Sequence, residues 1–311
     1  MLSRVADSLF WMSRYLERAG HTARVLNAQL YLMLERGAGT DASHWARVLK
    51  SLGIEDVENW AADDVVKPLI QAAAHPSSIV SCVTAARDNA RQVREQVSSE
   101  MWEQLNRLFH AVKNTNHKGD VRDFLQSILE GTYLFQGVTD STMTHGEGWQ
   151  FIQAGRYLER AAAVSTLVSV HFRAFHNDTQ VDLETLEWIG LLQSCMAFEA
   201  YCKAYTADLR PDRIAEFLVL SPVFPHSIRF AADALATSLK QIGEEASSRR
   251  ASRVERIVGR MQATLAYGQM DEIMSAGLQS YLDTVRRQCL QVYNSLYQTY
   301  ITYPVEAALN A

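Results

Sequence analysis

The chain contains 311 residues, of which 48% are hydrophobic and 21% are charged, close to the proportions of an ordinary globular protein. Glycine (15 residues) and proline (6 residues) are scarce, so turns are few and long helices are favoured over many short strands. The formal net charge of −5 argues against a nucleic-acid-binding protein, although a local cluster of arginines would still hold an anion.

The cysteines and the N-terminal segment indicate a cytoplasmic protein. The four cysteines are widely spaced and form no C-x-x-C pair, as is typical of a reducing compartment: Cys82, Cys195, Cys202 and Cys289. The N-terminus is charged from Arg4 and lacks the apolar run of a signal peptide. The charge-free stretches are shorter than the ~20 apolar residues that span a bilayer. We therefore expect neither nucleic acid nor a membrane as a partner.

Helical periodicity begins at the N-terminus, where apolar residues step by four and three positions along roughly 30 residues. This stripe consists of Val5, Leu9, Met12, Leu16, Ala19, Ala23 and Leu26. Further helices are expected at about 42–52, 58–73, 78–112, 119–138, 145–175, 180–206, 212–220, 226–245, 248–267 and 270–302. No alternating β pattern competes with them. The predicted fold class is all-α, a multi-helix bundle.

An internal repeat relates the two halves of the chain. The run from Arg14 to Ala19 recurs residue for residue from Arg156 to Ala161. Two weaker matches follow in the same order: Trp45, Leu49 and Ser51 match Trp188, Leu192 and Ser194, and Pro76, Ser78 and Ile79 match Pro225, Ser227 and Ile228. We infer two duplicated halves, 1–142 and 143–311, related by a pseudo-twofold axis within one unit. A chance similarity of helix starts is the alternative.

The repeated segment places charged side chains in a setting that favours burial. In the first copy Arg14, Glu17 and His21 share a helix face, and Arg18 follows Glu17. The second copy carries its charges on a helix that is apolar on nearly all sides, and these are Arg156, Glu159 and Arg160. Buried charges must be paired or must bind something, because desolvation costs several kcal/mol.

We therefore predict that each glutamate pairs with an arginine of the other copy. The two copies hold four positive and two negative charges, and this surplus favours an anion such as phosphate or carboxylate. Two interpretations stay open, a structural clasp of ion pairs and a ligand-binding or catalytic site.

A second basic segment lies at 86–94. Arg87, Arg91 and Arg94 are spaced to form one stripe, with Asn89 between them. It is either a second wall of the same anion site or an exposed helix face paired with acids. No metal-ligand motif and no nucleotide-binding motif occurs, so no metal and no other cofactor is expected.

At these residues the sequence resembles the bacterial alpha-E family, an α-helical domain with a conserved E-R motif and no assigned function. The resemblance covers essentially the whole chain. Its landmarks are Met1 to Ala6, Arg14 to Ala19, Ala86 to Arg91 followed by Trp102, Gly155 to Ala161, and Phe224 to Ser227. The E-R motif corresponds to Glu17-Arg18 and Glu159-Arg160.

The resemblance implies two partners, a circularly permuted ATP-grasp ligase and a transglutaminase-like protein, which are typically encoded beside or fused to such domains. It implies a part in a system that forms or cleaves amide bonds on a peptide. Because the sequence offers no set of nucleophile, base and metal, and its charges are symmetric, we expect a non-catalytic or accessory role in that system. The alternative is an enzyme of amide or aminoacyl transfer that binds a peptide or a phosphate-bearing substrate at the Glu/Arg cluster. A metal or cofactor bundle is the weakest hypothesis.

Overall fold

The computed structural model describes residues 1–36, 42–55, 65–73, 75–114, 120–175, 181–246 and 251–302. These residues form helices and no strand, which confirms the all-α prediction. The α-helices are α1 (Ser3–Arg36), α2 (Ala42–Ser51), α3 (Val66–Gln71), α4 (Ile79–Gln92), α5 (Ser99–Lys113), α6 (Val121–Thr142), α7 (Glu147–Phe175), α8 (Val181–Ser194), α9 (Phe198–Tyr205), α10 (Pro211–Leu220), α11 (Ile228–Ala246), α12 (Ala251–Ala266), α13 (Met270–Ala276) and α14 (Leu278–Leu296).

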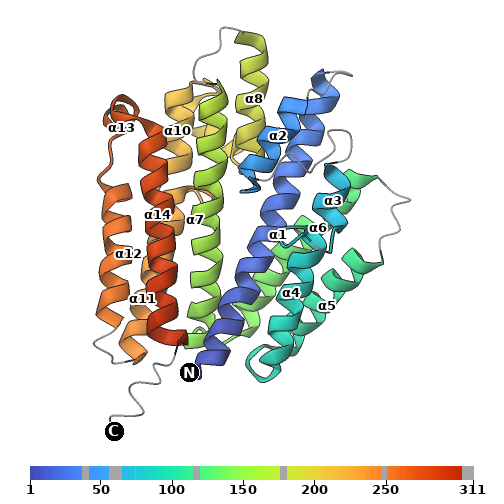
Figure 1. Cartoon of the computed structure of the whole chain (residues 1–311), viewed down its shortest axis with the longest axis vertical. Coiled ribbons are helices and arrows are strands. Elements are labelled where there is room, and N and C mark those ends of the chain that lie inside the picture. Colours follow the sequence, from blue (N-terminus) through green and yellow to red (C-terminus); the bar gives the residue numbers. More distant parts are fainter. Residues whose placement is uncertain are drawn as a thin grey trace.

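The two longest helices, α1 and α7, lie side by side in the middle of the bundle (Figure 1). Their backbones approach closely where Ser13 meets α7, since Ser13 Oγ donates a hydrogen bond to the carbonyl of Ile152 at 2.6 Å. A methyl group added at Gly155 would clash with the carbonyl oxygen of Phe10 and with Ser13 Oγ. The crossing therefore requires glycine at position 155. It sets the residues that follow Ser13 on α1 opposite those that follow Gly155 on α7.

The remaining helices surround this central pair in a reciprocal way. Helix α1 packs against α4, α6 and α8, whereas α7 packs against α11, α14 and α2. One helix of each half therefore packs against the central helix of the other half: α2 contacts α7, and α8 contacts α1. This pattern fits the predicted duplication. The pseudo-twofold axis and the boundary between 142 and 143 stay predictions.

The turns that precede α4 and α11 have the same local design. Ser78 Oγ accepts a hydrogen bond from the backbone N–H of Ser81 and donates one to the carbonyl of Ala72. Ser227 Oγ accepts one from the N–H of Phe230 and donates one to a carbonyl six residues upstream. A serine at each N-cap satisfies a free N–H of the first helical turn. The matched serines of the repeat thus occupy equivalent positions.

Several predicted helices are shorter than the periodicity indicated. The segment 78–112 divides into α4 and α5 at a 3₁₀ turn, η1 (Arg94–Gln96), after which Ser98 caps α5. The segment 180–206 divides at Met196, whose φ of 53° is left-handed. The segment 270–302 divides at Gly277 (φ 108°) and ends in a π-helical turn, η2 (Tyr297–Ile301). Of the helix predicted at 58–73, residues 58–64 lie outside the described residues, and α3 forms its end.

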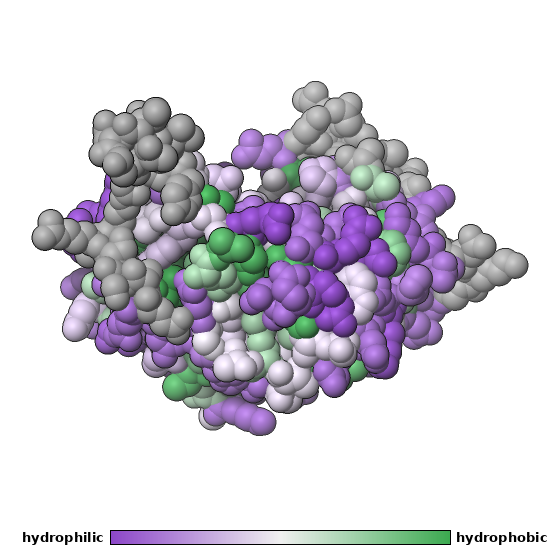
Figure 2. Space-filling view, turned by 90° about the horizontal axis from the view of Figure 1, so that it is seen from below, coloured by the Kyte–Doolittle hydropathy of each residue, from purple (hydrophilic) through white to green (hydrophobic). Residues whose placement is uncertain are grey.

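In the described part of the chain, every helix is too short or too polar to cross a membrane. Figure 2 views the bundle from below, and hydrophilic side chains cover most of the described surface there, with smaller apolar areas between them.

Candidate functional site

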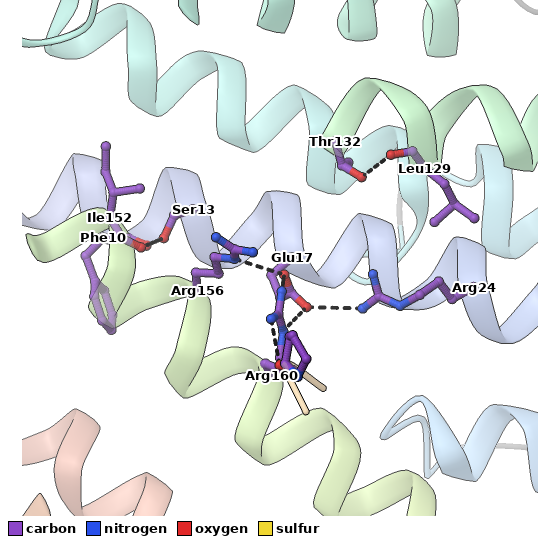
Figure 3. A network of polar contacts seen from close by, with 10 residues as sticks. Phe10, Ser13, Glu17, Arg24, Leu129, Thr132, Ile152, Arg156 and Arg160 are labelled. Carbon is purple, nitrogen blue, oxygen red and sulfur yellow. Dashed lines mark hydrogen bonds and ion pairs between the residues drawn. The ribbon is translucent and has the colours of Figure 1, made fainter. Parts of the chain in front are cut away.

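The first half of the site is the carboxylate of Glu17 on α1, which is surrounded by arginines (Figure 3). Arg160 on α7 binds it in a bidentate manner, with Nε 3.0 Å from Oε1 and Nη2 2.8 Å from Oε2. Arg24, two turns further along α1, donates from Nη2 to Oε1 at 3.1 Å. Nε of Arg156 lies 4.0 Å from Oε2, too far for a hydrogen bond. Three guanidinium groups therefore share one carboxylate.

The second half is the carboxylate of Glu159 on α7, which binds two arginines of α1. Arg14 Nε donates to Oε2 at 2.7 Å, and Arg18 Nε donates to Oε1 at 2.6 Å. The guanidinium of Arg14 also lies over the ring of Trp11, 4.5 Å from its centroid, a favourable cation–π arrangement. Each glutamate thus pairs with arginines of the other central helix, and the predicted reciprocal pairing is confirmed.

Burial and charge together determine the protonation of both glutamates. Glu17 and Glu159 are 3% and 7% exposed. Burial raises the pKa of Glu17, but the positive charges of Arg160 and Arg24 outweigh it and hold this pKa well below its usual range. In Glu159 the raising effect of burial is likewise exceeded by Arg14 and Arg18. Both side chains are therefore ionised at neutral pH, and their oxygens accept hydrogen bonds from guanidinium groups.

Positive charge exceeds negative charge in this cluster. Five arginines face two glutamates, because Arg24 joins the four arginines expected from the repeat. Nε of Arg24 and Nε of Arg156 are buried and have no hydrogen-bond partner among the described residues. Burial and the neighbouring charge of Arg160 lower the pKa of Arg156. The surplus charge is therefore concentrated around Glu17, where buried donors are free.

Two histidines beside the cluster are neutral. Burial, with the charge of Arg24, lowers the pKa of His21 to about 4. Burial, with the charges of Arg160 and Arg24, also moves the pKa of His226 well below its ordinary value. His21 lies on the predicted face of α1, but it adds no positive charge at neutral pH. Its Nε2 has no hydrogen-bond partner among the described residues.

A pocket of about 390 Å³ adjoins the cluster at Arg24, the one residue of the cluster in its wall. Its wall also contains Asn27 and Tyr31 of α1, and Met196 and Glu199 at the start of α9. Oδ1 of Asn27 is buried without a hydrogen-bond partner in the described structure. Arg24 therefore contacts both the buried carboxylate of Glu17 and a hollow that a ligand can enter. Sequence reasoning missed Arg24, although its position seven residues after Glu17 places it on the same helix face.

The basic stripe of α4 makes contacts outside this cluster. Arg87 Nε donates to Asn106 Oδ1 at 2.7 Å, and its guanidinium lies 4.4 Å from the ring centroid of Phe109 on α5. Asn89 donates a hydrogen bond to the carbonyl of Ala85 in its own helix. Arg91 is exposed and lies 3.5 Å from Asp88, and Arg94 donates to the carbonyl of Val97. The contacts of these side chains are thus with α5 (Arg87), with α4 itself (Asn89) and with an exposed acid (Arg91), which fits the interpretation as a helix face paired with its own neighbours. Their role as a second wall of the anion site stays a prediction.

Three buried thiols of the described structure border the cluster. Cys82 of α4 lies near Arg18 and Glu159, Cys289 of α14 lies near Arg14 and Glu159, and Cys195 lies near Arg24. Burial raises the pKa of each thiol to about 12, so all three are protonated and unreactive at neutral pH. Within the described ranges, no three side chains of His, Cys, Asp or Glu come together in a way that would hold a metal ion.

Comparison with known proteins places these features in a family. A family model described as a predicted alpha-helical domain with a conserved ER motif matches residues 1–301. Uncharacterized proteins of Mycobacterium bovis and Mycobacterium tuberculosis are 24–25% identical to this chain over an alignment 311 positions long. The alignment covers 90% of this chain and 34% of each relative. The chain thus spans about a third of the length of these curated relatives. No solved structure matches it. Because this model covers nearly the whole chain, the chain belongs to the Alpha-E family.

Proposed function

We propose that this chain is a non-catalytic component of a peptide amide-ligation or modification system in the bacterial cytoplasm. In this proposal it acts beside an ATP-grasp ligase and a transglutaminase-like protein, and it holds one of them or their peptide substrate. The observation that carries the non-catalytic part is the saturation of Glu17 and Glu159 by arginines of the opposite central helix.

A glutamate in this environment is a poor general base. A base must take up a proton near the working pH, and its carboxylate must reach the substrate. Here the arginines hold both glutamate pKa values below their usual range, and the carboxylate oxygens already accept guanidinium hydrogen bonds. The arrangement instead fixes α1 against α7, because moving one helix would strand buried charges on the other. We therefore assign the cluster the role of a clasp.

The greater length of the relatives supports the proposal that this chain works together with other polypeptides. The region similar to this chain makes up about a third of each mycobacterial relative, so there it is joined to a much longer polypeptide. The two named partners come from the family resemblance and form part of the proposal.

The test is reconstitution with the two proposed partners. ATP-dependent modification of a peptide is measured with and without the chain, and co-purification measures partner binding. Glu159→Gln should lower the melting temperature but leave partner binding and product per folded molecule unchanged. Glu103→Gln is the matched control, because Glu103 is exposed and only loosely paired with Arg107. A Glu17→Gln or Glu159→Gln protein that is fully folded and binds the partner, but yields no product, would contradict the proposal.

The surplus of arginines favours a second candidate, an enzyme of amide or aminoacyl transfer that binds an anionic substrate at the cluster. The free Nε groups of Arg24 and Arg156 and the pocket at Arg24 support it. Inorganic phosphate is the simplest probe, and stabilisation by phosphate in thermal melts should disappear in Arg156→Gln. This variant keeps the clasp, since Arg156 makes no hydrogen bond to Glu17. If phosphate stabilises both proteins equally, the cluster is not its site.

A further inference from the structure

A second basic site lies far from the clasp in sequence, in a groove between α12 and α14. The two helices run antiparallel, because α13 joins them at one end of the bundle (Figure 1). They are in contact at Thr264 of α12, whose carbonyl accepts from the hydroxyl of Tyr281 at 3.0 Å and whose Oγ1 accepts from Gln288 at 3.4 Å. The groove encloses about 480 Å³. Its walls consist of Arg253, Arg256, Ile257, Arg260, Gln291, Asn294, Ser295 and Gln298.

One bank of the groove is a stripe of three arginines. Arg253, Arg256 and Arg260 stand at i, i+3 and i+7 on α12, and all three are exposed. None of them lies within 4.0 Å of an acidic side chain in the described part of the chain. Other exposed arginines do have such partners, for example Arg107 with Glu103 and Arg210 with Asp212. The stripe is therefore a local surplus of positive charge that the protein itself does not neutralise.

The opposite bank consists of uncharged polar side chains with matching spacing. Gln291 and Asn294 on α14 and Gln298 in the following turn η2 stand at i, i+3 and i+7, and the antiparallel register sets Gln291 opposite Arg260. Ser295 lies between them, is 4% exposed, and its Oγ has no hydrogen-bond partner among the described residues. Side-chain amides offer both donors and acceptors, as a peptide backbone requires.

We propose that this groove binds an acidic segment of polypeptide, a partner or substrate with two or three carboxylates close together in sequence. The guanidinium groups bind the carboxylates, and the amide side chains with Ser295 bind the peptide backbone. This proposal is independent of the function assigned to the clasp.

The dimensions of the groove suit a short extended segment. From Arg253 to Arg260 the helix rises about 10 Å, at ~1.5 Å per residue. An extended chain covers this length in roughly three residues, and side chains two residues apart point to the same side. Two carboxylates separated by one residue therefore fall within reach of the flexible arginine side chains, which bind carboxylates through planar forks.

Nucleic acid fits the groove less well. Its lining contains no aromatic side chain on which a base would stack, and Ile257 is its only apolar member. The net charge of −5 also disfavours long polyanions, which meet the repulsion of the whole protein. A short acidic peptide interacts mainly with the groove, because charges beyond about 10 Å are largely screened at physiological salt.

The test measures the fluorescence anisotropy of a labelled peptide of alternating glycine and glutamate, titrated with the full chain at about 0.1 M salt, where the net charge is largely screened beyond about 10 Å. Reversing all three arginines (Arg253→Glu, Arg256→Glu and Arg260→Glu) should weaken binding by roughly tenfold or more, because three attractive charge pairs become repulsive. Ser295→Ala should weaken it by about threefold, as expected for one hydrogen bond. The control reverses three exposed arginines outside the groove, Arg107, Arg122 and Arg210, and so makes the same change in net charge.

The outcomes separate the proposal from its alternatives. Binding that falls with the groove variant but not with the control, and that is lost when glutamine replaces glutamate in the peptide, supports the proposal. Equal weakening by both triple variants means that only net charge matters and overturns it. Tighter binding of a trinucleotide of equal charge also overturns it and points to a nucleic-acid ligand. Circular dichroism and melting curves confirm that each variant is folded.

Discussion

Replacing Glu17 with glutamine tests the clasp most directly. The substitution keeps the size of the side chain but removes the charge that balances Arg160, Arg24 and Arg156. The side chains of Arg160 and Arg24 are only 2% and 4% exposed, so water cannot take the place of the carboxylate. Removing one member of a buried ion pair costs about 3–5 kcal/mol, and we expect a loss of stability in this range.

Glu159→Gln provides an internal comparison. Its partners Arg14 and Arg18 have side chains that are 14% and 26% exposed, so solvent compensates part of the loss. We expect about 2–3 kcal/mol, near the value for hydrogen bonds to charged groups. With roughly 2 °C per kcal/mol for a chain of this size, Glu17→Gln should melt about 6–10 °C lower and Glu159→Gln about 4–6 °C lower. The surface control Glu103→Gln should stay within about 1 °C.

The assay is urea unfolding followed by circular dichroism at 222 nm, a standard wavelength for helix, together with thermal melts. Adding Arg160→Met to Glu17→Gln should recover part of the loss, because the stranded charge is removed with its partner. The reasoning is refuted if Glu17→Gln melts within 2 °C of wild type, roughly 1 kcal/mol, or if Glu159→Gln costs more than Glu17→Gln.

Three further predictions follow from the fold. Gly155→Ala should cost about 3 kcal/mol or more because of its clash with α1, whereas Gly137→Ala, with open space around its Cβ, should be neutral or stabilising by up to ~1 kcal/mol; chemical unfolding compares them. Arg87→Met should lose about 1–2 kcal/mol in the same assay and Arg91→Met less than about 0.5, since only Arg87 binds Asn106 and stacks on α5. Because the folded pKa of His21 is lowered to about 4 from 6.5, the folded state binds fewer protons than the unfolded state between these values. Stability is then complete above pH 6.5 and falls with decreasing pH, by about 2 kcal/mol at pH 5, and His21→Gln should flatten this slope in unfolding curves measured across pH.

The sequence was sufficient to predict the pairing between the central helices. The second copy of the repeat lies on a helix with few polar positions, so its charges had to be paired internally, and the first copy offered matching partners. The same reasoning did not include Arg24, because it lies outside the repeated segment and a single arginine on an amphipathic helix looks like an ordinary surface residue. Periodicity identifies which face of a helix prefers burial, but it does not reveal that α1 is enclosed by α4, α6, α7 and α8.

The sequence pattern did not show which neighbour the arginine stripe of α4 faces. The spacing of Arg87 and Arg91 places them on one helix face, but it does not show that this face, which lies opposite Cys82, is the one that packs beside α5. Trp102 and Phe109, seven residues apart on α5, were the available signal, because aromatic rings at helical spacing can receive an arginine. The break at Met196 had no comparable signal, since a left-handed residue other than glycine is set by tertiary packing. For the break between α13 and α14, in contrast, the glycine at position 277 was a usable signal, because glycine readily adopts the positive φ found there.

The exchange of α2 and α8 between the halves has a consequence for cutting the chain. Residues 143–146 join α6 to α7, and Thr144 and His145 among them are exposed, so a nick there would leave every helix whole. The fragment 1–142 alone would lose the counterions of Arg14 and Arg18, and 143–311 alone would lose that of Arg160. Neither fragment would fold stably alone, but the two fragments expressed together should assemble into a tight heterodimer. Such a split protein could serve as a sensor of association between two proteins fused to its fragments.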